Sequence, residues 1–99
     1  MKIIIVEDEP AIARGIAKLL TITYKDIIIL DVCLNGSEGM ESILKNQPDL
    51  VFTDIRMPVM DGLEMIRQIH EKNFFPQFVI LTVYAEFEYA RTAMNLGVK

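Results

Sequence analysis

The fold of this chain is decided near its start by the stretch Ile3-Ile4-Ile5-Val6-Glu7-Asp8-Glu9-Pro10. Its four consecutive β-branched residues predict a strand that is buried on both faces of a sheet. Pro10 is typical of the first turn of a helix, where its missing N–H removes no hydrogen bond. Three acids lie between the two, so a strand, an acidic connection and a helix follow one another directly.

The same alternation continues along the rest of the chain. Further apolar runs at residues 27–30, 50–53 and 78–81 predict three more strands. Helical spacing of apolar residues predicts a helix after each strand, with Asp61 as the N-cap of the third and a last helix over about residues 85–96. Strands that alternate with helices form βαβ units, which predicts an α/β sandwich with a parallel sheet between two helical layers.

Composition limits the classes of function. The chain has 99 residues, enough for one domain, and 52% of them are hydrophobic. The net charge is −4 without a cluster of Lys or Arg, which argues against direct binding of nucleic acid. Cys33 is the single cysteine, so no internal disulfide can form. No apolar run is long enough for a membrane span. We therefore expect a cytoplasmic protein with no membrane contact.

Polar side chains follow three of the predicted strands. The first strand is followed by Glu7-Asp8, the third by Asp54 and the fourth by Thr82. Ligands of open parallel sheets bind at this edge, so three carboxylates converge if the first and third strands are neighbours. Their repulsion needs a cation, and a few carboxylate oxygens suit Mg²⁺. A carboxylate beside a metal can attack phosphorus to form an acyl phosphate, which the Thr82 hydroxyl could then hydrogen-bond.

Each of these signals also has a plainer interpretation. The acids Glu7-Asp8-Glu9 fit the N-terminus of an ordinary helix, which the helix dipole favours. Asp54 can be read as an ordinary loop residue that follows an apolar strand, and Thr82 taken alone does not indicate any function. Only the combination of the three signals, with carboxylates after two strands and a hydroxyl after another, favours a phosphoacceptor site with a metal ion.

Several stretches resemble the receiver domains of bacterial response regulators. The opening at residues 4–10 is similar to the acidic pair of that family, and residues 48–62, PDLVFTDIRMPVMDG, are very similar to its phosphoacceptor signature. Val79-Ile80-Leu81-Thr82 resembles its switch strand, and residues 87–90 and 96–99 look like the subgroup often fused to an AraC-type DNA-binding domain. The resemblance covers the whole chain, as one receiver domain over residues 1–99. It implies a flavodoxin-like fold with a parallel sheet of order 2-1-3-4.

The resemblance implies roles for individual residues. Asp54 would accept a phosphoryl group from a sensor histidine kinase. Asp8 would bind Mg²⁺ directly, Glu7 would hold it through water, and Asp54 and the backbone carbonyl of Arg56 would complete the protein ligands. The residues that would shape the active-site loop are Pro58 and Gly62. Such a domain is a signalling receiver that catalyses only its own phosphotransfer and dephosphorylation.

The resemblance also implies a switch after the fourth strand. Thr82 would contact the phosphoryl group and drive the change of conformation. Val83 stands where the family usually has Ala or Gly, and its branched side chain is expected to narrow access to Asp54. Arg56 and Tyr84 each lie two residues beyond the acceptor and the switch. Their bulk is expected to hinder the attacking water and so to slow dephosphorylation.

The chain stops short of the family pattern. Lys99 precedes the position of the fifth strand and the fifth helix, and it is not the lysine that the family carries after that strand. We therefore expect a C-terminally incomplete receiver whose fourth strand has an exposed edge. Homo-oligomers through that edge follow from this expectation. DNA would be contacted only through a C-terminal output domain that this segment lacks.

Other functions stay open at this point. One is a folded interaction module that no longer signals. A second is a hydrolase with an aspartyl-phosphate intermediate, although that class wants an acid where Arg56 stands. A third, a nucleotide or flavin binder, would need a glycine-rich or hydroxyl-rich loop in place of Glu7-Asp8-Glu9, whose charges repel phosphate.

Overall fold

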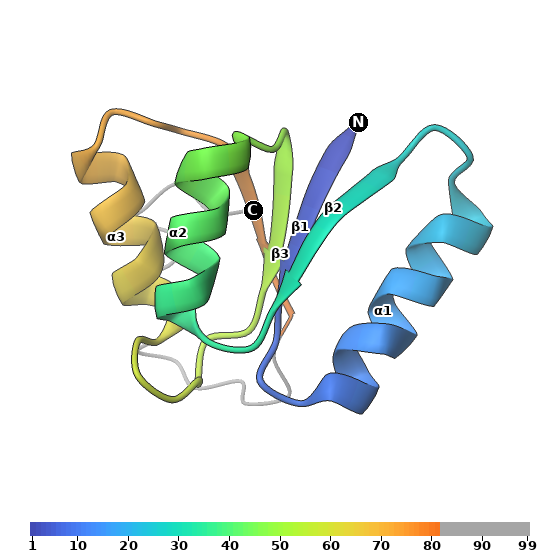
Figure 1. Cartoon of the computed structure of the whole chain (residues 1–99), viewed down its shortest axis with the longest axis horizontal. Helices are drawn as coiled ribbons and strands as arrows, with labels where there is room; N and C mark the ends of the chain where they lie inside the picture. The colour runs from blue at the N-terminus through green and yellow to red at the C-terminus, as the bar shows by residue number, and fades with distance from the viewer. Residues whose placement is uncertain (82–99) are drawn as a thin grey trace.

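A computed structural model describes residues 1–81 of the chain as strands and helices in strict alternation (Figure 1). The elements are β1 (Lys2–Val6), α1 (Pro10–Thr23), β2 (Ile28–Cys33), α2 (Gly36–Asn46), β3 (Leu50–Thr53), α3 (Gly62–Glu71) and β4 (Gln77–Ile80). The fourth strand begins one residue earlier than the sequence predicts, at Gln77. The predicted helix over residues 85–96 lies outside the described residues, as do Thr82, Val83 and Tyr84.

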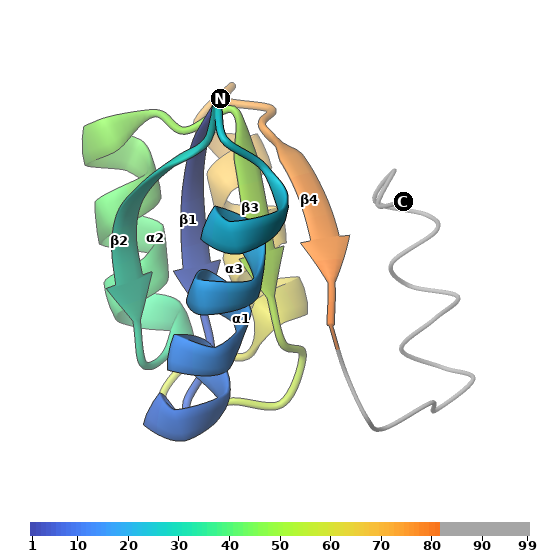
Figure 2. The ribbon, with the colours of Figure 1, turned by 90° about the vertical axis from the view of Figure 1, so that its right-hand side faces the viewer.

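All four strands are parallel, in the order β2-β1-β3-β4. Val6 of β1 is paired with Thr53 of β3, so these two neighbouring strands end side by side. Helix α1 lies on one face of the sheet, and α2 and α3 lie on the other (Figures 1 and 2). This arrangement confirms the predicted three-layer, flavodoxin-like fold with sheet order 2-1-3-4.

The hydrophobic core is concentrated between the sheet and the α2–α3 layer. Its buried members are Ile4, Val6, Cys33, Ile43, Val51, Met65, Ile66, Ile69 and Phe78. Helix α3 buries five residues, whereas α1 buries only Ala13. The α1 layer is therefore the thinner one. None of the helices within residues 1–81 is long and apolar enough to cross a bilayer.

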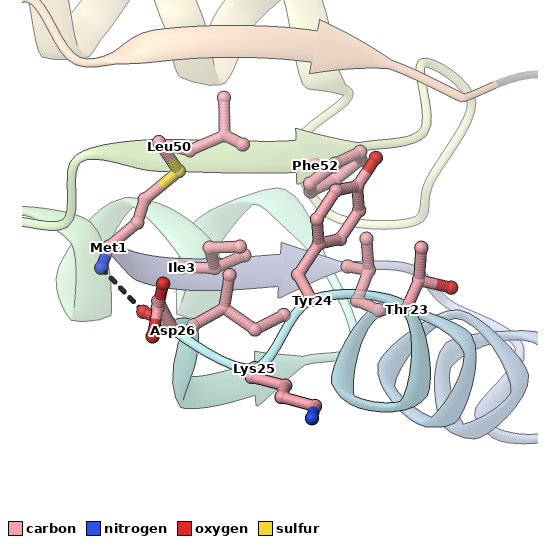
Figure 3. A pocket seen from close by; sticks show the side chains of 10 residues that line it. Met1, Ile3, Thr23, Tyr24, Lys25, Asp26, Leu50 and Phe52 are labelled. Atoms are coloured by element: carbon pink, nitrogen blue, oxygen red, sulfur yellow. Dashed lines mark hydrogen bonds between the residues drawn. The ribbon is translucent and has the colours of Figure 1, made fainter.

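The thin layer leaves a hollow beside the connection between α1 and β2 (Figure 3). It measures about 540 Å³ and is floored by Ile3, Leu50 and Phe52 of the sheet. Tyr24 rises beside it, and the Met1 amine donates a hydrogen bond to the Asp26 carbonyl at its rim (2.9 Å). The hollow lies on the opposite side of the sheet from the main core.

Two glycines let α2 approach the end of the sheet where β1 and β3 terminate. A Cβ on Gly39 would lie 2.9 Å from both Cγ atoms of Val6 and 2.8 Å from the sulfur of Met65. A Cβ on Gly36 would lie 2.1 Å from the carbonyl oxygen of Met60, in the β3–α3 connection. A side chain at position 39 would hold α2 away from that end of the sheet, and one at position 36 would force α2 and the β3–α3 connection apart.

Candidate functional site

The carboxyl ends of β1 and β3 bring three acids together. The Asp54 N–H donates to the carbonyl of Val6 (3.0 Å), which extends the β1–β3 ladder to the first residue after β3. The Glu7 N–H donates to the carbonyl of Cys33 (2.9 Å), which ties the end of β1 to β2. As a result, one carboxylate oxygen each from Glu7, Asp8 and Asp54 lies within 4.8 Å of the other two. The structure thus assembles the acids that the sequence predicts to converge.

Asp54 is held in a fixed orientation by its neighbours. Its Oδ1 accepts a hydrogen bond from the N–H of Ile55 (2.7 Å), and its carbonyl accepts one from the Thr53 hydroxyl (2.8 Å). Gly62 approaches the same carbonyl so closely that a Cβ on Gly62 would lie 2.1 Å from it. The Gly62 N–H also donates to the Ile55 carbonyl (2.7 Å). The Ile55 N–H therefore orients the Asp54 carboxylate, and the contacts from Thr53 and Gly62 hold the backbone of Asp54 in place.

Glu7 is buried beside two other acids, and its titration reflects this. Its residue is only 4% exposed. The pKa of Glu7 is raised from 4.5 to about 7, mainly by burial; the charges of Asp54 and Asp8 contribute to this rise, and a hydrogen bond from the Glu9 N–H opposes it. A buried carboxylate among like charges is destabilised unless it is protonated or meets a cation. The site therefore favours a cation electrostatically.

The donor set fits Mg²⁺. This ion takes oxygen ligands in an octahedron at about 2.0–2.1 Å, so two direct ligands can be at most about 4.2 Å apart. One carboxylate oxygen each of Glu7, Asp8 and Asp54 lies within 4.8 Å of the others, close enough for all three to surround one ion, directly or through water. Few protein ligands would leave several positions for water or for a phosphoryl oxygen.

The β3–α3 connection, residues 54–61, carries the other predicted site residues and is called the site loop below. Arg56 and Pro58 both lie in it and are exposed. The Pro58 carbonyl accepts a hydrogen bond from the Met60 N–H (2.7 Å), which tightens the turn around Val59. Val59 itself has a φ of 70°, a conformation that β-branched residues rarely adopt. Backbone strain of this kind often marks functional loops.

Sequence reasoning identified the acids and the loop but missed Gly36. The Gly36 N–H donates to the Met60 carbonyl (3.0 Å), so the first residue of α2 contacts the site loop. From the sequence, Asn35-Gly36 indicated only the end of a strand. A more informative signal was present, because Asn35 and Glu38 have the spacing of a helix capping box. That signal predicts the start of α2 but not what the helix start contacts.

Comparison with known protein families identifies a match over nearly the whole chain. The pattern of the response regulator receiver domain matches residues 3–99. The transcriptional regulatory protein YesN of Bacillus subtilis is 39% identical over 98 residues, which are 99% of this chain and 27% of that protein. The nitrate/nitrite response regulator protein NarL of Escherichia coli is 30% identical over 95 residues, 96% of this chain and 44% of NarL. The chain thus spans less than half the length of these relatives.

Solved structures show the same relationship. A DNA-binding response regulator of the LuxR family from Staphylococcus aureus superimposes with a TM-score of 0.92 at 30% identity, over 98% of this chain and 80% of that one. The receiver domain of AraT, a response regulator from Geobacillus stearothermophilus, gives a TM-score of 0.87 at 32% identity, over 99% of this chain and 76% of that one. Fold and sequence therefore agree on one family.

Proposed function

The chain belongs to the family of response regulator receiver domains, and from this premise we propose that it accepts a phosphoryl group on Asp54 with Mg²⁺ bound beside it. The observation that carries the proposal is the meeting of Asp54, at the end of β3, with Glu7 and Asp8, at the end of β1. The donor is a phosphohistidine of a sensor histidine kinase. The accepted group then switches an output of the larger protein.

Asp54 acts as the nucleophile in this proposal. One of its carboxylate oxygens forms a bond to phosphorus while the phosphorus–nitrogen bond of the donor breaks, and the histidine leaves with its nitrogen lone pair. The transfer depends mainly on positioning and on charge neutralisation. The Ile55 N–H contributes positioning, because it fixes one oxygen of Asp54. The domain catalyses only its own phosphorylation and dephosphorylation.

Mg²⁺ would be held by Asp8 and Asp54 directly, by Glu7 through water, and by the backbone carbonyl of Arg56. When bound, the ion neutralises charge on the acids and on the transferred phosphoryl oxygens. Its affinity should be weak, because few of the ligands come from the protein. Support for this ligand set comes from Glu7, a buried carboxyl whose pKa is raised mainly by burial and also by the charges of Asp54 and Asp8, so that a cation beside it would be favourable.

The remaining roles concern the output. Thr82 would contact the phosphoryl group as the switch, with Val83, Tyr84 and Arg56 modulating access to Asp54. The longer relatives include proteins named as transcriptional regulators, which supports regulation of transcription in the cytoplasm. Contact with DNA would then belong to an output domain outside this segment.

Phosphorylation with a small-molecule donor tests the proposal. The chain is incubated with acetyl phosphate and Mg²⁺, and the adduct is mapped by mass spectrometry after borohydride trapping. We expect one phosphoryl group on Asp54, lost in Asp54→Asn and in wild type without Mg²⁺, and retained in Asp26→Asn, which changes an exposed acid outside the site. An equal adduct in Asp54→Asn would refute the assignment. Steady turnover of phosphate esters would indicate a hydrolase instead, and no adduct at all would favour a non-signalling interaction module.

A further inference from the structure

The N-terminus of α2 is one of the most firmly fixed points near the site. The Asn35 side chain accepts a hydrogen bond from the Glu38 N–H (2.9 Å), and the Glu38 carboxylate accepts one from the Leu34 N–H (3.2 Å). These two side-chain acceptors satisfy backbone N–H groups in the first turn and just before it, and so fix the start of the helix. Gly39, in the same turn, packs against Val6, the residue that precedes Glu7. This helix start is thus fixed relative to the acidic end of β1.

The first N–H groups of a helix have no acceptor within the helix. The N–H of Gly36 finds its acceptor in the site loop, at the carbonyl of Met60 (3.0 Å). Met60 lies four residues after Arg56, whose carbonyl is a proposed metal ligand. The hydrogen bond from the Gly62 N–H to the Ile55 carbonyl joins the two ends of the loop. The Gly36 contact therefore adds a further anchor between these two ends, at Met60.

The contact requires glycine at position 36. A Cβ there would lie 2.1 Å from the carbonyl oxygen and 2.8 Å from the carbonyl carbon of Met60. Both partners are backbone, so no side-chain rotation can relieve the clash. Because α2 is held by its cap and by Gly39, the loop has to yield. A larger residue at position 36 would therefore displace the loop away from α2.

We propose that Gly36 is a positioning residue for the metal and phosphoacceptor site, acting through the Met60 carbonyl on the loop that carries Arg56. The inference rests on the proposed function and extends it to a residue outside the acidic cluster. It assigns to the start of α2 a role in holding the loop ready for the ion. Partners that orient metal ligands without touching the metal typically change affinity by roughly 10–100-fold when they are removed.

A matched pair of glycine substitutions tests the inference in the full chain. Gly36→Ala is compared with Gly15→Ala, because a Cβ at Gly15 in α1 would meet nothing within 4 Å. The binding of Mg²⁺ alone is titrated by NMR of the methionine methyl groups, since Met57 and Met60 both lie in the site loop. We expect Gly36→Ala to weaken Mg²⁺ binding by roughly 10–100-fold and to shift the Met60 methyl signal. Gly15→Ala should do neither.

Wild-type amide exchange provides a second measurement that does not depend on the folding of a variant. Coupling between two events is reciprocal, so a contact that favours Mg²⁺ binding must itself be strengthened by Mg²⁺. Exchange of the Gly36 N–H should slow when Mg²⁺ is added. Because this N–H has no acceptor within α2, its protection reports on the Met60 contact alone.

The outcomes separate this inference from the proposed function. If wild type binds Mg²⁺ and Gly36→Ala binds it equally well, Gly36 has no positioning role and the proposed function stands. Unchanged exchange of the Gly36 N–H on adding Mg²⁺ would overturn the inference in the same way, even if Gly36→Ala failed to fold. If wild type does not bind Mg²⁺ at all, the proposed function falls, and this inference falls with it.

Discussion

Among residues 1–81, Glu7 is the one charged residue that is buried, so burial and charge conflict there. Its pKa rises from 4.5 to about 7 on folding, mainly because the carboxyl is buried. Below about pH 4.5 the group is neutral in the folded and the unfolded chain. As the pH rises towards 7 the unfolded chain ionises first, so the folded state loses stability, by up to roughly 3 kcal/mol.

This linkage gives a testable pH dependence. Without divalent cations, wild type should be less stable at pH 8 than at pH 5 by urea unfolding, and Glu7→Gln should remove most of that difference. Glu41→Gln, which changes an exposed acid of α2, should leave the pH dependence unchanged. A Glu7→Gln variant that is as pH-sensitive as wild type would show that Glu7 is not the group responsible.

Val59 should also carry a measurable local strain. Its φ of 70° is unfavourable for a β-branched residue, and its side chain is 83% exposed, so little packing would be lost on substitution. Gly adopts a positive φ without a steric penalty. We expect Val59→Gly to stabilise the fold by about 1 kcal/mol in thermal or urea unfolding. Val59→Ala, which keeps most of the left-handed penalty, should gain less; equal stability of all three proteins would argue against strain.

At the scale of single residues, the convergence of the acids could be predicted from the sequence, whereas the contacts of the site loop could not. Glu7, Asp8 and Asp54 follow apolar strands, and the carboxyl ends of parallel strands share one edge, so periodicity was sufficient to bring them together. The contact between Gly36 and Met60 joins two connecting segments. Its existence depends on the distance between α2 and the site loop, which no repeat in the sequence encodes. The positive φ of Val59 could not be predicted from the sequence either, because Val has no intrinsic preference for that conformation.

Among the helices, glycines of similar appearance should respond in opposite ways to the same substitution. Gly15 in α1 faces open space, so Gly15→Ala should stabilise the protein by about 0.5–1 kcal/mol through helix propensity. Gly39 in α2 lies against Val6 and Met65, so Gly39→Ala should destabilise it by about 1–3 kcal/mol through overpacking. Urea unfolding of both variants checks the signs. A stabilising Gly39→Ala would mean that the Met65 side chain moves aside without cost.

The helix and strand boundaries were predictable where a local residue sets them. Pro10 begins α1, and Asp61 caps α3 by accepting a hydrogen bond from the Glu64 N–H (2.8 Å), as the sequence predicts. The predicted start of β4 was wrong by one residue, because pairing with β3, and not the type of side chain, sets where the strand begins. Gln77 already donates to the Asp49 carbonyl.

On the scale of the whole molecule, the α1 side of the sheet is the more sparsely covered one within residues 1–81. Leu19 and Ile22 of α1 are 66% and 69% exposed, and their sequence neighbours Leu20 and Thr23 line the apolar hollow of Figure 3. Exposed apolar patches of this kind promote association. Within residues 1–81, β4 also has a neighbouring strand on its β3 side only. We therefore expect the 99-residue chain to self-associate at high concentration.

Two sets of variants distinguish the surfaces in analytical ultracentrifugation. Leu19→Glu with Ile22→Glu should reduce association through the α1 face. Ile80→Pro should reduce association through the edge of β4, because Gln77 and Leu81 donate their N–H groups to β3 and the alternating Ile80 N–H faces the other way. A wild-type chain that stays monomeric at high concentration would contradict both routes.

The central position of β1 also matters while the protein is being made. β1 leaves the ribosome before both strands that pair with it, β2 and β3. Its four apolar residues, Ile3 to Val6, are therefore without sheet partners until those two strands have been synthesised. Strand pairing over such sequence distances is slow and exposes nascent chains to aggregation. The strand that leads into Glu7 and Asp8 is thus the one for which a chaperone at the ribosomal exit would matter most.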